Sequence, residues 1–322
     1  MDTGARLYFH SPCFDGIASA AIARSFLVRR RQWPDPELTV VDYGVRDQWC
    51  ATPFPQQAAV VDFLFHPEAA FWADHHATTF LEPSAASSFR SDEETKLYDP
   101  SAASCAGLLQ SWLRRRGQAE AQFDALATWA DKIDSAAYES VDEALFPVAP
   151  ALRIAASLSL ASSADCISLV RMLGTGILDE AARDPGVSTR AALVDELVES
   201  GLRRVKQSLR IDDSEIARFE VDGRDVIVNR YSAYRFAPTA RYSASLIFGQ
   251  DGARISVMRN PWMQFESIHL GKLCSRFGGG GHQRVGAVHI PSTSTSRARD
   301  VFTSLVRSMA TEDRRAVVAK AG

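Results

Sequence analysis

Four apolar runs within the first 76 residues each end in acidic or histidine side chains. They are His10 and Asp15 after the first run, Asp42 after the second, Asp62 after the third, and Asp74, His75 and His76 after the fourth. Carboxylates gathered at one place repel one another unless a cation neutralises them. Carboxylates mixed with imidazoles suit Mn²⁺, Fe²⁺ or Zn²⁺, whereas an all-oxygen set suits Mg²⁺. The pattern predicts a divalent-metal site if the fold brings these run ends together.

Each of these residues could also have a purely structural role. A single aspartate after a strand is more often a turn residue or a helix N-cap, which is the interpretation we favour for Asp42 alone. Downstream, "ATWADKIDSA" places Asp131 and Asp134 three residues apart, on one face of a helix. The apolar neighbours of Asp131 favour a buried carboxylate, which needs a partner. The alternative is a pair of solvated acids near a helix end.

The elements that must position these residues alternate in type. Strands are expected at 6–9, 38–44, 58–65 and 69–76, and helices at 16–30, 101–116 and 121–136. This alternation predicts an α/β fold in which a mostly parallel N-terminal sheet carries helices on both faces. In such sheets ligands bind beyond the carboxyl ends of the strands, so the four run ends would face one crevice.

The second half of the chain predicts a smaller α/β domain. We expect a metal-binding domain over 1–190, a helical connector over 191–211, the second domain over 212–310 and a tail over 311–322. Within the second domain, "DG" at Asp222–Gly223 predicts a hairpin over 216–230. Strands are expected at 253–260 and 286–290, and helices at 267–277 and 296–310.

Composition narrows the class of protein. The chain has 322 residues, 46% hydrophobic and 23% charged, with a net charge of −3, so it is globular and not a basic nucleic-acid coat. Five cysteines without a CxxC spacing argue against a disulfide framework and favour a reducing cytoplasm. Neither a signal peptide nor a membrane span is expected.

The motifs together resemble the DHH phosphoesterases. "HSPCFDGIASAA", "VVDF", "DHH" and "LATWADKID" match the four N-terminal motifs of that family in order, and "FGGGGHQRVGA" matches the glycine-rich motif of its DHH-associated C-terminal domain. The motifs extend from residue 10 to 287 and so cover most of the chain. The family includes RecJ-type exonucleases, nanoRNases and cyclic-dinucleotide phosphodiesterases. The resemblance implies an active site in the cleft between two domains.

The resemblance also implies roles for individual residues. The metal ligands would be His10, Asp15, Asp62, His75 and Asp131; the catalytic pair His76 and Asp74; and the substrate-binding residues Arg259, Gly279, Gly280, Gly281 and His282. The ions would be two Mn²⁺, with Mg²⁺ as an alternative. Cys13 stands where the family carries an acid, so one ion site is expected to be weaker, differently selective or empty.

The implied activity is that of a divalent-metal-dependent phosphodiesterase. It would use metal-activated water to hydrolyse short single-stranded oligonucleotides, dinucleotides or related nucleotide phosphates, and the chain length fits the compact nanoRNase-like members. Two alternatives stay open: a bisphosphonucleotide phosphatase, and a nucleotide-binding regulatory protein with an impaired metal site. RNA versus DNA, and a homodimer versus a monomer, are not decided by the sequence.

Overall fold

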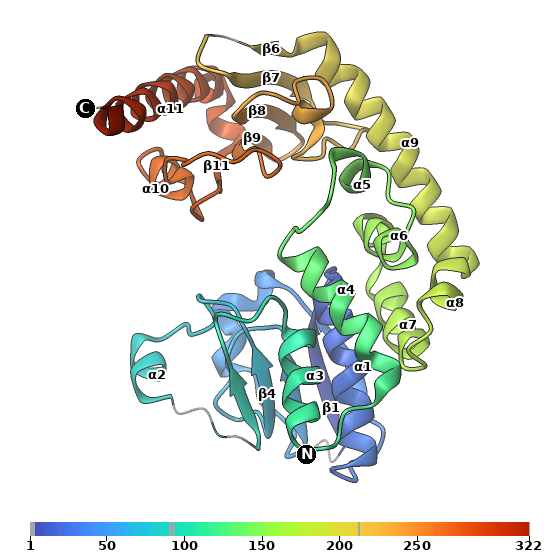
Figure 1. The fold of residues 1–322 in the computed structure, drawn as a ribbon. Helices are drawn as coiled ribbons and strands as arrows, with labels where there is room; N and C mark the ends of the chain where they lie inside the picture. Colours follow the sequence, from blue (N-terminus) through green and yellow to red (C-terminus); the bar gives the residue numbers. More distant parts are fainter. Residues whose placement is uncertain (1–3, 90–91, 93, 212, 322) are drawn as a thin grey trace. The chain divides into compact units, whose positions relative to one another are not determined.

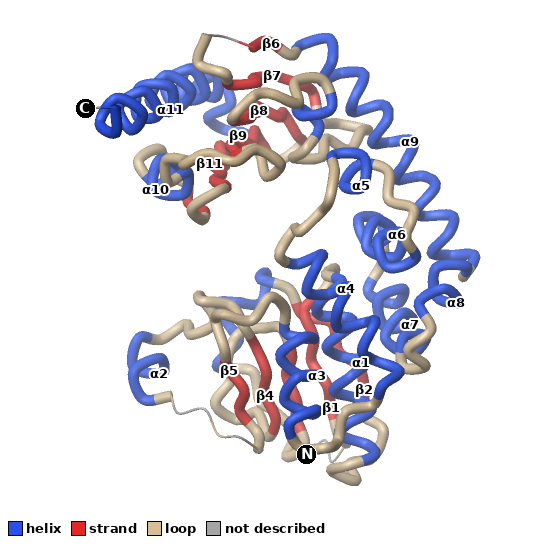
Figure 2. Tube along the Cα trace, viewed as in Figure 1, coloured by secondary structure: helices blue, strands red, loops and turns tan. Residues whose placement is uncertain are grey.

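The computed structural model describes residues 4–89, 92, 94–211 and 213–321. The chain forms two compact units (Figure 1). The first comprises Met1–Tyr138 and Pro147–Ala192, and the second comprises Glu139–Phe146 and Leu193–Gly322. Both units carry a sheet with helices against it (Figure 2).

A five-stranded parallel sheet forms the centre of the first unit. Its strands, in spatial order, are β2 (Glu37–Val41), β1 (Arg6–His10), β3 (Ala58–Val61), β4 (Phe71–Asp74) and β5 (Lys96–Tyr98). All four neighbouring pairs run parallel, which confirms the predicted α/β class. Strand β1 lies between β2 and β3, so the ends of β1, β3 and β4 are adjacent at one edge of the sheet.

The two faces of this sheet are covered differently. The helices α1 (Phe14–Arg29) and α3 (Cys105–Arg115) pack on one face, and α4 (Asp124–Asp134) packs on both of them. The other face carries an aromatic cluster that includes Trp49, Phe63 and Trp72, covered in part by the 3₁₀ helix η1 (Tyr43–Ala51). Because side chains alternate along a strand, β1 contributes Leu7 and Phe9 to the helical face and Tyr8 to the aromatic face.

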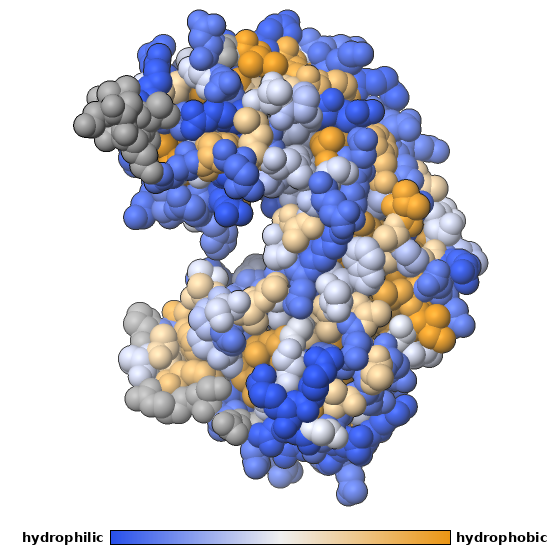
Figure 3. All heavy atoms as spheres, viewed as in Figure 1, coloured by the Kyte–Doolittle hydropathy of each residue, from blue (hydrophilic) through white to orange (hydrophobic). Residues whose placement is uncertain are grey.

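Shorter helices complete this part of the chain. They are α2 (Pro83–Ser88), η2 (Ala121–Phe123), α5 (Val141–Leu145), α6 (Pro150–Ser157), η3 (Leu158–Leu160), α7 (Ser163–Leu173) and α8 (Leu178–Arg183). All of them belong to the first unit except α5, which belongs to the second. Helix α9 (Pro185–Ser208) begins in the first unit and ends in the second. No helix in the described part of the chain is long and apolar enough to span a bilayer. The molecular face drawn in Figure 3 carries mainly hydrophilic residues with apolar residues scattered among them.

A six-stranded sheet forms the second unit. Its order is β10 (Gly280–Gly281), β11 (Val285–Pro291), β9 (Gly252–Arg259), β8 (Tyr242–Gly249), β7 (Ile216–Asp222) and β6 (Arg210–Ile211). The pairs are antiparallel except β7 with β8. Besides α5 and the C-terminal part of α9, the helices of this unit are η4 (Ser232–Arg235), α10 (Leu270–Ser275), η5 (Ser292–Arg297) and α11 (Ala298–Ala321).

The hairpin predicted over 216–230 is wrong. Strand β7 ends at Asp222 and pairs in parallel with β8, so the chain after Gly223 does not fold back along it. The backbone N–H of Ile227 instead donates to the carbonyl of Leu197 in α9 at 3.1 Å. A Cβ on Gly201 would lie 2.1 Å from the Ile227 oxygen, so glycine there admits this close approach. The "DG" turn signal was overridden by packing against α9.

Two other features differ from the prediction. Strand β8 was not predicted because both of its faces are buried, which removes the alternating pattern of a half-exposed strand. Helix α11 was expected to end at residue 310 but continues to Ala321. Asp313, within the predicted tail, is 7% exposed and accepts a hydrogen bond from the Tyr242 hydroxyl at 2.7 Å, so tertiary contacts hold the extension in place.

Candidate metal centre

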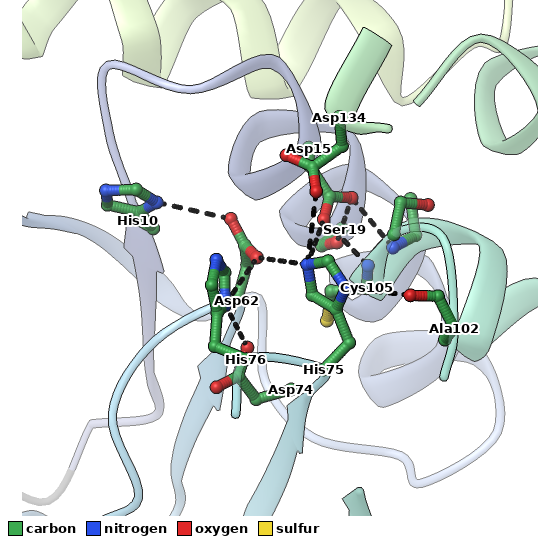
Figure 4. A network of polar contacts seen from close by, with 12 residues as sticks. His10, Asp15, Ser19, Asp62, Asp74, His75, His76, Ala102, Cys105 and Asp134 are labelled. Carbon is green, nitrogen blue, oxygen red and sulfur yellow. Dashed lines mark hydrogen bonds and ion pairs between the residues drawn. The ribbon is translucent and has the colours of Figure 1, made fainter. Parts of the chain in front are cut away.

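Three adjacent strand ends bring three of the five predicted metal ligands together, His10, Asp62 and His75 (Figure 4). His10 ends β1, Asp62 follows β3, and Asp74 ends β4 with His75 directly behind it. Asp42, which directly follows β2, has a different role. Its carboxylate accepts a hydrogen bond from the N–H of Gly44 at 2.6 Å and caps η1, which confirms the N-cap interpretation.

The start of α1 places Asp15 in the same group. The Asp15 carboxylate accepts hydrogen bonds from the backbone N–H groups of Cys105 at 2.7 Å and Ala106 at 2.8 Å, the first two residues of α3. The positive end of the α3 dipole therefore favours the negative charge of this carboxylate. A Cβ on Gly16 would lie 2.0 Å from the His10 carbonyl, so the glycine of "DG" lets α1 begin tightly against β1.

The ring of His75 is fixed with one nitrogen aimed at carboxylates. Its Nδ1 lies 3.0 Å from the carbonyl of Ala102, which can only accept, so Nδ1 carries the proton. In the neutral ring Nε2 is then a lone-pair acceptor. That atom lies 3.4 Å from Asp134, 3.6 Å from Asp15 and 3.7 Å from Asp62. It is buried and has no hydrogen-bond partner within the described residues.

Asp62 shows the same lack of partners. Its side chain is buried, and Oδ2 lies 3.3 Å from Nδ1 of His10. The other oxygen, Oδ1, is 3.7 Å from both His75 and His76 and has no hydrogen bond to any described residue. Burial, followed by the charge of Asp15, raises the pKa of Asp62 well above its usual value. A buried carboxylate of this kind destabilises the folded state unless a cation neutralises its charge.

The donor atoms form three overlapping groups, each with all its atoms within 4.8 Å of one another. They are His10, Cys13 and Asp62; Asp62, His75 and His76; and Asp15, His75 and Asp134. Asp62 and His75 belong to two groups each. Cys13 thus occupies a position within reach of a cation, where burial followed by the charge of Asp15 raises the pKa of its thiol to about 12.

His76 belongs to one of these groups, but its hydrogen-bond partner is Asp74. Its Nδ1 lies 2.8 Å from Oδ1 of Asp74, which is fully buried. Burial lowers the pKa of His76, but the hydrogen bond and charge of Asp74 outweigh it and raise the pKa above its ordinary value. The His76 side chain is 30% exposed, which leaves its other ring nitrogen, Nε2, accessible.

Asp131 is not brought into these groups. Its Oδ1 accepts a hydrogen bond from the Ser104 hydroxyl at 2.6 Å, at the N-cap of α3. A Cβ on Gly107 would lie 2.2 Å from that oxygen, so Asp131 packs directly on the start of α3. Asp134, one helical turn on and at the last residue of α4, reaches His75 instead. Burial, followed by the charge of Asp15, raises the pKa of Asp134 to about 6.

Arg259 in the second unit is engaged by its own chain. The residue is 7% exposed, and its guanidinium donates to the carbonyls of Asn260, Met263 and Phe265 at 2.7 to 3.0 Å. It also lies over the Phe265 ring at 4.3 Å. These contacts hold the loop that follows β9. Arg284, whose carbonyl accepts from the Arg259 N–H at 2.9 Å, is exposed.

The glycine-rich segment forms a tight return from α10 into the sheet. The N–H of Gly279 donates to the Cys274 carbonyl at 3.0 Å, and Gly280 and Gly281 form β10 beside β11. A Cβ on Gly279 would lie 2.0 Å from the Ala287 oxygen and one on Gly281 would lie 2.3 Å from the Val285 oxygen. Gly280 has open space around it, and His282 is exposed.

The residues present fit a divalent cation. Within the described residues, the ion-pair partners of Asp15, Asp62 and Asp134 are histidines, whose ring nitrogens are themselves metal ligands. The buried acceptor atoms of Asp62, Asp74 and His75 lack donors in the same part of the chain. A cation would supply the charge and the bonds that these atoms do not find in the protein.

Sequence reasoning did not assign Asp134 or Cys13 as donors. The signal for Asp134 was its spacing of three from Asp131, which placed both acids on one helical face without showing which one reaches the strand ends. The helix end decides this, because α4 terminates at Asp134. For Cys13, its place in the first motif was visible, but its nearness to His10 and Asp62 required the fold.

Comparison with known proteins supports the same fold. No protein-family model matches the chain, and no curated protein does. The structure is similar to the pGpG-specific phosphodiesterase PggH from Vibrio cholerae, with a TM-score of 0.71 and 16% identity over 94% of this chain and 99% of that one. It is also similar to RecJ in complex with Mn²⁺ from Thermus thermophilus, with a TM-score of 0.57 and 17% identity over 94% of this chain.

The match spans only 52% of the Thermus RecJ. A third similar structure is the DHH domain of a member of the s1p family of ribosomal proteins, with a TM-score of 0.51 and 14% identity over 94% of this chain and 86% of that one. The chain therefore has the fold of the DHH-domain proteins that its motifs resemble.

Proposed function

We propose that this chain is a divalent-metal-dependent phosphodiesterase acting on dinucleotides and short oligonucleotides. The observation that carries the proposal is the His75 Nε2 lone pair, buried and facing the carboxylates of Asp15, Asp62 and Asp134. The fold adds support, because PggH is a pGpG-specific phosphodiesterase and RecJ is seen with Mn²⁺.

Two cations are proposed. One would be held by His10, Cys13 and Asp62, and the other by Asp15, His75 and Asp134, with Asp62 close to both. When bound, such a pair lowers the pKa of a water and offsets the charge on a phosphate. The carboxylates and imidazoles favour Mn²⁺, while the thiol of Cys13 shifts the first site toward softer ions such as Zn²⁺ or Fe²⁺.

The protein's own contribution is to orient groups and to supply a proton. Asp74 holds Nδ1 of His76, leaving Nε2 for the substrate. Because the pKa of His76 is raised, the ring carries a proton to higher pH and can donate it to a phosphate oxygen or to the leaving oxygen. Asp15, fixed by the N-terminus of α3, keeps one ligand position rigid before substrate arrives.

Substrate contacts in the second unit are proposed for His282 and Arg284, which are exposed. Gly280 remains a proposed contact because nothing fills the space where its side chain would be. Arg259, Gly279 and Gly281 were expected to touch substrate. Their contacts within the chain support a second role, holding the loop and the hairpin that present the exposed residues.

The substrate class is proposed from the similarity to PggH. That pGpG-specific phosphodiesterase is matched along 99% of its length with a TM-score of 0.71, which favours a dinucleotide or very short strand. All five cysteines are free thiols, which suits a reducing cytoplasm.

A substrate panel tests the proposal. We expect Mn²⁺-dependent hydrolysis of pGpG and pApA, slower hydrolysis of five-mers and longer strands, and loss of all turnover in EDTA. The panel also includes cyclic dinucleotides and 3′,5′-bisphosphonucleotides. Turnover of the bisphosphonucleotide alone would make the protein a phosphatase. Tight dinucleotide binding with no bound metal and no turnover would make it a binding protein.

A further inference from the structure

Tyr43 is an exposed aromatic side chain beside the candidate metal centre. It is 42% exposed, and no other phenylalanine, tyrosine or tryptophan among the described residues is comparably exposed. Aromatic side chains are normally withdrawn from water because burying them is strongly favourable. The exposed Tyr43 ring is therefore available for contact with a ligand at the edge of the polar site.

The local backbone fixes where this ring lies. Tyr43 is the first residue of η1, immediately after the cap residue Asp42. The Asp42 carboxylate accepts from the Gly44 N–H at 2.6 Å, and its carbonyl accepts from the Val45 N–H at 3.2 Å. Tyr43 is thus held between two backbone-anchored residues at the end of β2, the strand next to β1.

Two ring contacts place the Tyr43 side chain beside the candidate metal centre. Its ring centroid lies 5.3 Å from that of His10 at an interplanar angle of 71°, and 5.4 Å from that of Phe63. His10 in turn lies 3.3 Å from the Asp62 carboxylate. The Tyr43 ring therefore contacts one proposed cation ligand, His10, directly, and only the His10 side chain separates it from Asp62.

We propose that the ring of Tyr43 stacks on one of the two nucleobases whose sugars are joined by the phosphodiester that is cleaved. The inference rests on the proposed function and names the part of the substrate that this residue recognises. A phosphate at the metal centre carries its base one sugar away, and the exposed ring of Tyr43 offers a flat apolar surface there. Stacking on tyrosine suits any base, because each base has a π-face, so Tyr43 would select nucleotides over other phosphodiesters without reading sequence.

A cycle of two protein variants and two kinds of substrate tests this. The substrates are pApA and analogues of it in which one or the other base is absent. We expect Tyr43→Ala to raise KM for pApA about 5- to 100-fold, the range that loss of one stacked base produces, with a smaller change in kcat. Tyr43→Phe should keep the wild-type KM, because the ring and not the hydroxyl is needed. For one abasic analogue, wild type and Tyr43→Ala should have equal KM.

Val45→Ala is the matched control. Val45 is 39% exposed on the same 3₁₀ helix, and its truncation should leave all the substrates unaffected. An equal rise of KM for pApA and both abasic analogues in Tyr43→Ala would overturn the stacking role and indicate a structural one. A loss in Tyr43→Phe as large as in Tyr43→Ala would overturn it in favour of the hydroxyl.

A fluorescence measurement separates this inference from the proposed function. The probe is a 2-aminopurine dinucleotide with a non-hydrolysable methylenephosphonate linkage, titrated in Mg²⁺. Stacking should quench the probe in wild type and Tyr43→Phe, and the quench should be lost in Tyr43→Ala. If the wild type hydrolyses no phosphodiester, the proposed function fails, while the quench still decides the role of Tyr43. Equal quenching in wild type and Tyr43→Ala would overturn it.

Discussion

Each unit of the molecule buries an aspartate, and the two aspartates have opposite surroundings. Asp313 in the second unit accepts hydrogen bonds from the Tyr242 hydroxyl at 2.7 Å and from Nη2 of Arg241 at 3.1 Å, and it forms an ion pair with Nη1 of Arg241 at 2.9 Å. Asp62 in the first unit faces histidines and other carboxylates, and one of its oxygens has no hydrogen bond within the described residues.

The contrast distinguishes a structural polar group from one arranged for a ligand. A buried polar atom left without a partner costs about 1–3 kcal/mol, and more if it is charged. In the second unit the arginine and tyrosine remove this cost. In the first unit, Oδ1 of Asp62 has neither a Lys or Arg ion pair nor a hydrogen bond in the described part of the chain, so the cost remains until a cation binds. Burial of an aspartate alone would not have told the two cases apart.

The largest effect is expected from replacing Asp62. Asp62→Ala should abolish measurable phosphodiester hydrolysis, because the residue belongs to two of the three donor groups. The assay is Mn²⁺-dependent turnover of pApA, with the bound metal counted by plasma mass spectrometry. Asp42→Ala is the control, because Asp42 also follows a strand but only caps η1. Metal content and turnover equal to wild type in Asp62→Ala would contradict the proposed site.

Replacing Asp313 should affect stability instead. Asp313→Ala should lower the free energy of unfolding of the second unit by about 3–5 kcal/mol, since it removes a buried carboxylate and leaves the partly buried Arg241 without its partner. Urea unfolding measures this loss, and Glu220→Ala is the control because Glu220 pairs with the exposed Arg299. Mn²⁺ affinity should stay at the wild-type value. Wild-type stability in Asp313→Ala would show that the two aspartates do not differ as described.

Replacing Asp134 and replacing Asp131 should have different effects on the affinity for Mn²⁺. Asp134→Ala should weaken Mn²⁺ binding at least about tenfold, a loss that even residues behind a ligand commonly produce. Asp131→Ala should weaken it less, because its carboxylate bonds to Ser104 rather than facing His75. Calorimetric titration of Mn²⁺ compares the two. A larger loss in Asp131→Ala would restore the role that the sequence assigned to that residue.

The smallest effect is a pH dependence of stability in the metal-free protein. The folded pKa of Asp134 is raised to about 6, so the folded state holds a proton that the unfolded state loses near pH 4. Stability should therefore fall as pH rises from about 4 to about 6. Urea unfolding in EDTA at several pH values measures it, and Asp134→Asn should flatten that part of the curve. An identical slope in Asp134→Asn would refute the assignment.

Much of the first unit follows from the sequence because its signals are local. The strands around residues 6–10, 58–61 and 71–74 are short apolar runs, and each ends in a polar residue that parallel strands must place at one edge. The resemblance of "DHH" and the glycine-rich motif to one family added the fold of the second unit. What failed there was a local signal: "DG" marked a hairpin, but the chain packs on α9 instead.

By itself the sequence determined the α/β class, the parallel sheet and the set of residues from which a cation site could be built, because residue type and spacing along strands and helices carry that information. Only the tertiary structure decided that Asp134 rather than Asp131 reaches His75, that Cys13 joins His10 and Asp62, and that Arg259 is held by its own loop. These outcomes depend on where helices end and on which side chains meet across elements far apart in the chain. Such distances are set by packing, which no local pattern records.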